Sequence, residues 1–205
     1  WSSILGEGAS VGTEARGQKQ ATAVYTKNQF TVTDYAGYIE GSGKLYQGIY
    51  LEKGAHKFTV TLKSTGGNNS LFFANSVMKQ HVSDLNAVSI ISSEVVDLTA
   101  EYAEYTFIFR VEKEGVYAIG VCHEGEGRVY LDDASVERDL AMDEIFVARD
   151  ELLYQVEVAQ KFTSSDEYTQ ESMDKLLKAI EDAQVILANK NATILEITGA
   201  ETAIR

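Results

Sequence analysis

The hydrophobic pattern of this 205-residue chain changes its period once, near residue 139. Upstream of that point, apolar residues alternate with polar ones: KFTVTLKS (57–64) places Phe58, Val60 and Leu62 on one face of an extended segment. Such runs recur about every ten residues, separated by glycine-containing breaks such as STGGNNS and HEGEG. This spacing predicts a β-sandwich of the jelly-roll type over residues 1–138.

Downstream, the apolar spacing is that of α-helices. Thr169 is a predicted N-cap of a second helix, and Thr193 with Glu196 forms a predicted capping box for a third. Gly199 should weaken that third helix by about 1 kcal/mol relative to alanine. Residues 139–205 therefore predict a three-helix bundle, and the fold class is a multidomain β-then-α chain. The apolar faces of its first two helices are predicted to hold Ile145, Ala148, Leu152, Val156 and Ala159, and Met173, Leu176, Leu177, Ile180 and Leu187.

The charge balance limits the partners of the chain. Eighteen basic and 31 acidic residues give a formal net charge of −13, which disfavours nucleic acid and anionic membranes. No run of about 18 apolar residues exists, so no membrane span is expected. The chain opens at Trp1 rather than Met, and we expect a mature product or a piece of a larger protein, with any targeting segment and other domains outside it.

Two adjacent aspartates stand in the segment RVYLDDASVERD (128–139). If Val129 and Leu131 face the core, Asp132 faces outward, and Asp133 faces inward unless the strand ends or bulges there. An ionised carboxylate is not left bare in a core, so one of the two needs a cation, a hydrogen-bonded turn or solvent. Three interpretations remain open: ligands of a structural calcium ion, a strand end, or direct contact with a sugar.

Aromatic and amide side chains are frequent in the first part of the chain, above all in TDYAGYIEGSGKLYQ. Pyranose rings stack their C–H faces on tyrosine or tryptophan, while planar amides bind the hydroxyl groups. The predicted carbohydrate-binding residues are Trp1, Tyr35, Tyr38, Tyr46, Gln47 and Asn75, with Tyr25 and Asn28 as further candidates.

Catalysis has little support in the sequence. The acidic residues are scattered, and His56, His81 and His123 lack the spacing of metal ligands. No nucleophile elbow, phosphate-binding loop or dinucleotide fingerprint is present. We therefore expect neither an enzyme nor an organic cofactor.

Three segments of the first region are similar to galactose-binding-like jelly-roll carbohydrate-binding modules: KLYQGIYLEKGAHKFTVTLK (44–63), LFFANS (71–76), and EYTFIFRVEKEGVYAIGV followed by VYLDDASVE. The resemblance implies a glycan ligand and, as in many relatives, a structural calcium ion with Asp132 as a ligand. The chain departs from the family where it opens directly at Trp1 and where Lys53-Gly54 replaces a Pro-Gly turn. The missing first strand would remove one wall of the calcium site.

The stretch EYTQESMDKLLKAIEDAQVILANKNATILEITGAETAI resembles the FIVAR repeat, over roughly residues 143–205. Together the two resemblances imply a non-catalytic glycan-binding module with a helical spacer, in a bacterial secreted or cell-surface protein associated with polysaccharide degradation. The alternative is a structural or adhesion spacer without a sugar site, and the least favoured function is a small glycoside hydrolase. A groove with two or more exposed coplanar aromatic rings beside amides would favour sugar binding, whereas a sandwich that buries all its tyrosines would favour the spacer.

Overall fold

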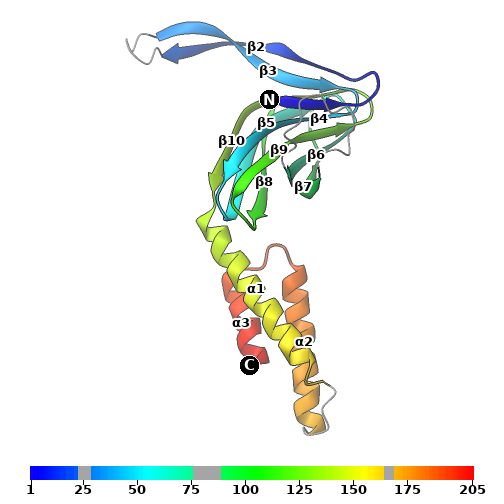
Figure 1. Ribbon diagram of the computed structural model, residues 1–205, viewed down its shortest axis with the longest axis vertical. Coiled ribbons are helices and arrows are strands. Elements are labelled where there is room, and N and C mark those ends of the chain that lie inside the picture. Colours follow the sequence, from blue (N-terminus) through cyan, green and yellow to red (C-terminus); the bar gives the residue numbers. More distant parts are fainter. Residues whose placement is uncertain (23–28, 76–88, 164–168) are drawn as a thin grey trace. The chain divides into compact units, whose positions relative to one another are not determined.

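The computed structural model describes residues 1–22, 29–75, 89–163 and 169–205, with the backbone alone at 17–22 and 29–34 (Figure 1). The chain divides into two compact units, Trp1–Arg138 and Asp139–Arg205. Within the described residues, the first unit consists of strands and the second of helices. The predicted fold class, a β-sandwich followed by three helices, is confirmed.

In the described part of the sandwich the strands form two five-stranded antiparallel sheets, which we name sheet I and sheet II. Successive strands repeatedly change sheet along the chain, as they do in jelly rolls. Sheet I has the spatial order β1 (Ser2–Leu5), β4 (Gly43–Leu51), β9 (Gly115–Glu124), β6 (Asn68–Asn75) and β7 (Ile90–Val96). Sheet II has the order β2 (Ser10–Thr22), β3 (Gln29–Glu40), β10 (Arg128–Arg138), β5 (Gly54–Ser64) and β8 (Ala103–Val111).

The main core lies between the inner faces of the two sheets. Strand β5 shows how the sequence produces it, because Phe58, Val60 and Leu62 alternate with partly exposed residues and are all buried, as predicted. Phe73 of β6 stacks on Phe109 of β8 with ring centroids 4.4 Å apart, and this contact joins sheet I to sheet II. Burial of these side chains is the dominant stabilising contribution of the sandwich.

A second apolar cluster lies on the outer face of sheet I. Gly120 of β9 pairs with Tyr46 on one side and Phe72 on the other. A β-carbon at Gly120 would lie 2.7 Å from the Cα of Tyr46, so only glycine allows this close approach. Cys122 belongs to the same cluster, and burial raises the pKa of its thiol.

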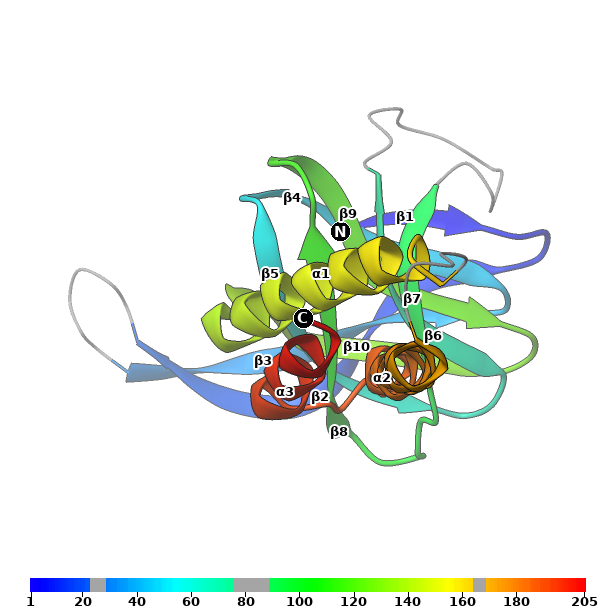
Figure 2. The same cartoon turned by 90° about the horizontal axis from the view of Figure 1, so that it is seen from below.

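Three helices form the second unit and pack side by side (Figures 1 and 2). They are α1 (Leu140–Gln160), α2 (Gln170–Ala188) and α3 (Ile194–Ile204). Thr169 accepts a hydrogen bond from the backbone N–H of Ser172 at 3.2 Å, as an N-cap does. Thr193 and Glu196 form the predicted capping box, with Glu196 Oε2 accepting from the Thr193 N–H at 2.7 Å.

The helical core agrees with the predicted apolar faces except at Met173 and Leu177. Met173 is half-buried and lines a cavity instead. Leu177 is exposed, because Leu176 and Ile180 turn towards the core and the neighbouring residue lies about 100° away around the helix. In the part of the chain that the structure describes, no helix is long and apolar enough to cross a membrane. The buried residues of this core are Leu152, Val156, Ala159, Ile180, Ala183, Ala192 and Ile197.

Candidate functional site

A groove opens on the inner face of sheet II because the strands of the two sheets differ in length. Strand β1 has four residues, whereas β2 has 13 and β3 has 12. Strand β10 pairs with β3 only as far as Leu131–Gly37, and beyond Gly37 the β2–β3 pair continues as a two-stranded ribbon (Figure 1). Next to Trp1 this leaves a cavity of about 510 Å³.

Two exposed aromatic side chains and an amide line this groove. Trp1 is 53% exposed and Tyr35 is 56% exposed. Ser2 pairs with Tyr46, so the register places Trp1 beside Gln47, whose amide is exposed in the same cavity. A second cavity of about 220 Å³ shares Trp1, Gln47 and Ala134 with the first, so the two adjoin and extend the groove towards Ile49. This combination can stack on a sugar ring and bind its hydroxyl groups.

Four of the six predicted sugar-binding residues line the groove, namely Trp1, Tyr35, Tyr38 and Gln47. The ring of Tyr38, however, is covered by Arg128 on the outer face of sheet II. Tyr46 is only 7% exposed, because it belongs to the outer cluster of sheet I. Asn75 ends β6 opposite Tyr117 and does not line the groove. The further candidates Tyr25 and Asn28, and also His81, lie outside the described residues.

Asp132 and Asp133 lie at the rim of the groove, in a β-bulge. The register with β5 shifts between Asp132 and Ser135, and Asp133 has a φ of 44°, in the left-handed region. The Asp133 N–H donates to Oδ1 of Asp132 at 2.9 Å. Of the arrangements that the sequence left open, the bulge is the one observed, and it turns the Asp133 side chain into solvent with 66% of its surface exposed.

Arg16 is a charged neighbour of the groove that sequence reasoning missed. Its guanidinium pairs with Asp132, lies 3.6 Å from Oδ2 of Asp133 and covers the ring of Tyr102 at 4.1 Å. A register shift between Ala15 and Gly17 on β2 places Arg16 there. No local sequence pattern signals this irregularity, because it depends on how β2 pairs with β3.

The predicted calcium site is affected by this ion pair. Asp132 and Asp133 already share the Arg16 guanidinium, so a calcium ion between them would have to displace Arg16. Among the described residues, no group of three or more His, Cys, Asp or Glu side chains could hold a metal ion. The calcium site stays a prediction.

A second group of aromatic residues covers the outer face of sheet II, but cations already cover its rings. The Lys63 ammonium lies 4.4 Å from the Tyr130 ring centroid and 4.6 Å from that of Tyr102. The Arg128 guanidinium lies 4.7 Å over Tyr38 and pairs with Glu40 at 3.0 Å. The hydrogen bond to Glu40 raises the pKa of Arg128, so this side chain stays charged. These rings stabilise the sheet by cation–π contacts, and less of their surface is open to a ligand than at Trp1 and Tyr35.

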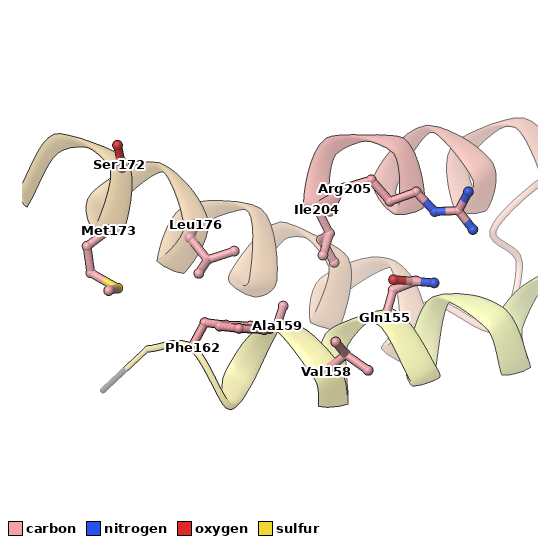
Figure 3. Close-up of a pocket in the computed structure, with 9 residues that line it drawn as sticks. All are labelled: Gln155, Val158, Ala159, Phe162, Ser172, Met173, Leu176, Ile204 and Arg205. Carbon is pink, nitrogen blue, oxygen red and sulfur yellow. The ribbon is translucent and has the colours of Figure 1, made fainter. Parts of the chain in front are cut away.

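The helical unit also contains a cavity, of about 490 Å³, beside the end of α3 (Figure 3). Phe162, Met173 and Leu176 supply its apolar wall, and Figure 3 shows Gln155 and Arg205 at one end. Arg205 is already paired with Glu151 and Glu201. Because its wall is mainly apolar and the arginine is neutralised, this cavity lacks the convergent polar groups of a sugar site.

Comparisons with known proteins identify no family for this chain. No protein-family model matches the sequence, and no curated protein matches it.

Solved structures that overlap with it include one described as CBM4, with 15% identity, a TM-score of 0.42, and coverage of 60% of this chain and 78% of that chain. Another is the CBM22-1 xylan-binding domain of Xyn10C from Paenibacillus barcinonensis, at 8% identity and a TM-score of 0.43, covering 66% and 85%. A third is TmCBM61 in complex with β-1,4-galactotriose, at 17% identity and a TM-score of 0.39, covering 65% and 90%. Overlaps this weak do not bear on what the chain binds.

Proposed function

We propose that the sandwich is a non-catalytic glycan-binding module whose sugar site is the groove lined by Trp1, Tyr35 and Gln47. The observation that carries this proposal is the pair of exposed aromatic rings beside an exposed amide in a single cavity of about 510 Å³. Burying such rings against the C–H face of a sugar is favourable, and the amide can both donate to and accept from hydroxyl groups.

The burial pattern favours sugar binding over a spacer sandwich without a ligand site. A sandwich that serves only as a spacer has no need to keep large aromatic side chains in solvent beside a cavity. Tyr46 follows that rule and is buried, whereas Trp1 and Tyr35 do not. Large exposed apolar groups that gather at a concave surface are typical of ligand sites.

The helical unit is proposed to act as a spacer, in line with its resemblance to FIVAR repeats. We place the protein outside the cell or at the bacterial cell surface, in a larger protein associated with polysaccharide degradation, because the two resembled families occur there. A structural calcium ion at Asp132 and Asp133 belongs to the same proposal. Its test is calorimetric titration of the full chain with calcium and of the Asp132→Asn variant.

The sugar site is tested by calorimetric titration with a panel of soluble plant, host and bacterial polysaccharides in the presence of calcium. We expect Trp1→Ala and Tyr35→Ala each to weaken binding about tenfold, or about 1.4 kcal/mol, because each removes a stacking surface. Tyr50→Ala is the matched control, since Tyr50 is 62% exposed but does not line the groove. Binding to no member of the panel, or an equal loss in the Tyr50 variant, would contradict the proposal. Turnover of aryl glycosides would instead indicate a hydrolase.

A further inference from the structure

We infer that the groove selects neutral glycans over anionic ones and that Asp133 is the residue that sets this selectivity. The inference rests on the proposed sugar site and goes beyond it, because it names the charge class of the ligand and a specificity-determining residue.

The ionised side chains on the surface of the groove are of one sign. Among the described side chains that line the two adjoining cavities, the ionised ones are Asp132 and Asp133, and no lysine, arginine or histidine is present. Arg16 approaches from outside the lining, pairs with Asp132 and lies 3.6 Å from Oδ2 of Asp133. These three groups together carry one net negative charge, and Asp133 is the most exposed of them.

The backbone holds the Asp133 carboxylate at this rim. The bulge between Asp132 and Ser135 gives Asp133 its φ of 44°, a conformation that aspartate adopts more readily than most residues with a β-carbon. The N–H of Asp133 is bonded to Asp132, and Asp132 in turn is bonded to Arg16. The carboxylate therefore reaches the groove from a fixed backbone rather than from a free loop.

An exposed carboxylate interacts differently with neutral and with anionic glycans. Hydroxyl groups of a neutral sugar can donate to it in charge-assisted hydrogen bonds. A uronate or sulfate group at the same place would be repelled by the carboxylate. For two like charges about 4 Å apart in water, this repulsion weakens the affinity about fivefold. The chain's net charge of −13 adds to this repulsion at low ionic strength.

The test compares a neutral glycan that binds the groove with the same glycan after oxidation of its primary hydroxyl groups to carboxylates. We expect the oxidised form to bind the full chain at least about fivefold more weakly at low salt. This difference should shrink as salt rises, because the two charges are exposed to solvent. It should shrink also in Asp133→Asn, a substitution that keeps both the size of the side chain and its tolerance of a left-handed backbone.

Glu112→Gln is the control, because it makes the same change in net charge at an exposed residue paired with Arg110, outside the groove lining. It should keep the wild-type discrimination. Equal binding of the neutral and oxidised forms by the wild type would overturn the inference while leaving the sugar site intact. Equal relaxation in the Asp133 and Glu112 variants would also overturn it, since the effect would then belong to the overall charge. Failure of every neutral glycan to bind would overturn the proposed function itself.

Discussion

His123 is a buried polar side chain near the end of β9. Its Nδ1 lies 2.8 Å from Oδ1 of Asn69, so the neutral ring can donate to this amide oxygen. Gly67, at a φ of 73°, lies against the ring so closely that a β-carbon would collide with it. Burial lowers the pKa of His123, although the Gly127 backbone partly opposes this shift.

A buried neutral histidine makes stability depend on pH. The pKa of His123 is about 6.5 in the unfolded chain and lower in the folded chain. The contribution of the neutral His123 to the free energy of unfolding is therefore fully present above about pH 6.5. It is lost as the pH falls below that value, because the unfolded state then binds more protons than the folded state. We expect the free energy of unfolding of the wild type to fall more steeply than that of His123→Gln between about pH 7.5 and about pH 5. Parallel pH profiles in denaturant unfolding would contradict this account.

The groove residues show how far sequence reasoning reaches at this scale. The abundance of aromatic and amide residues predicted Trp1, Tyr35 and Gln47 as sugar-binding residues, and the structure places all three at the groove. Tyr46 precedes Gln47 directly and so points to the opposite face, where Phe72 and Cys122 bury it. The sequence does not show which of two apolar faces of a strand meets solvent. Which face is buried depends on the other strands and side chains that pack against it.

Single elements respond in opposite ways to the same substitution. Gly199 lies in α3, and a β-carbon there would have no heavy atom within 4 Å apart from its immediate surroundings in the helix. Gly199→Ala should therefore stabilise the helical unit by about 1 kcal/mol, as the sequence analysis expects from helix propensity. Gly120→Ala in β9 should destabilise the sandwich by about 3 kcal/mol, because the backbone of β4 occupies the space.

Denaturant unfolding measures both effects, with far-ultraviolet circular dichroism for the helical unit and fluorescence for the sandwich. Each variant serves as the control for the other, since the chemical change is identical. A destabilising Gly199→Ala or a neutral Gly120→Ala would show that the packing around these glycines differs from the one described.

The elements differ in how well the sequence predicts them. Helix caps such as Thr169 and the Thr193–Glu196 box depend on residues within one turn, and both are confirmed. The bulge in β10 was one of the alternatives that the adjacent aspartates left open. The bulge in β2 was not foreseen, because strand irregularities depend on pairing with residues far away in the sequence.

At the scale of the whole molecule, the change of hydrophobic period coincides with the passage from β10 to α1. Strand β10 ends at Arg138, and Asp139 caps α1 by accepting from the Met142 N–H at 3.0 Å. One core consists of alternating inward residues of two sheets, and the other of helix faces. The period therefore predicted the fold class, whereas the groove arises from unequal strand lengths that the period does not encode.

The most direct test of the sugar site uses the fact that Trp1 is the only tryptophan in the chain. Its fluorescence therefore reports on the groove without mutation. The protein is titrated with a glycan whose binding has been measured by calorimetry. We expect the tryptophan emission to shift to shorter wavelength and its quenching by acrylamide to decrease. Both changes should give the same dissociation constant as calorimetry. Saturable binding with unchanged emission and unchanged quenching would place the ligand elsewhere and contradict the account.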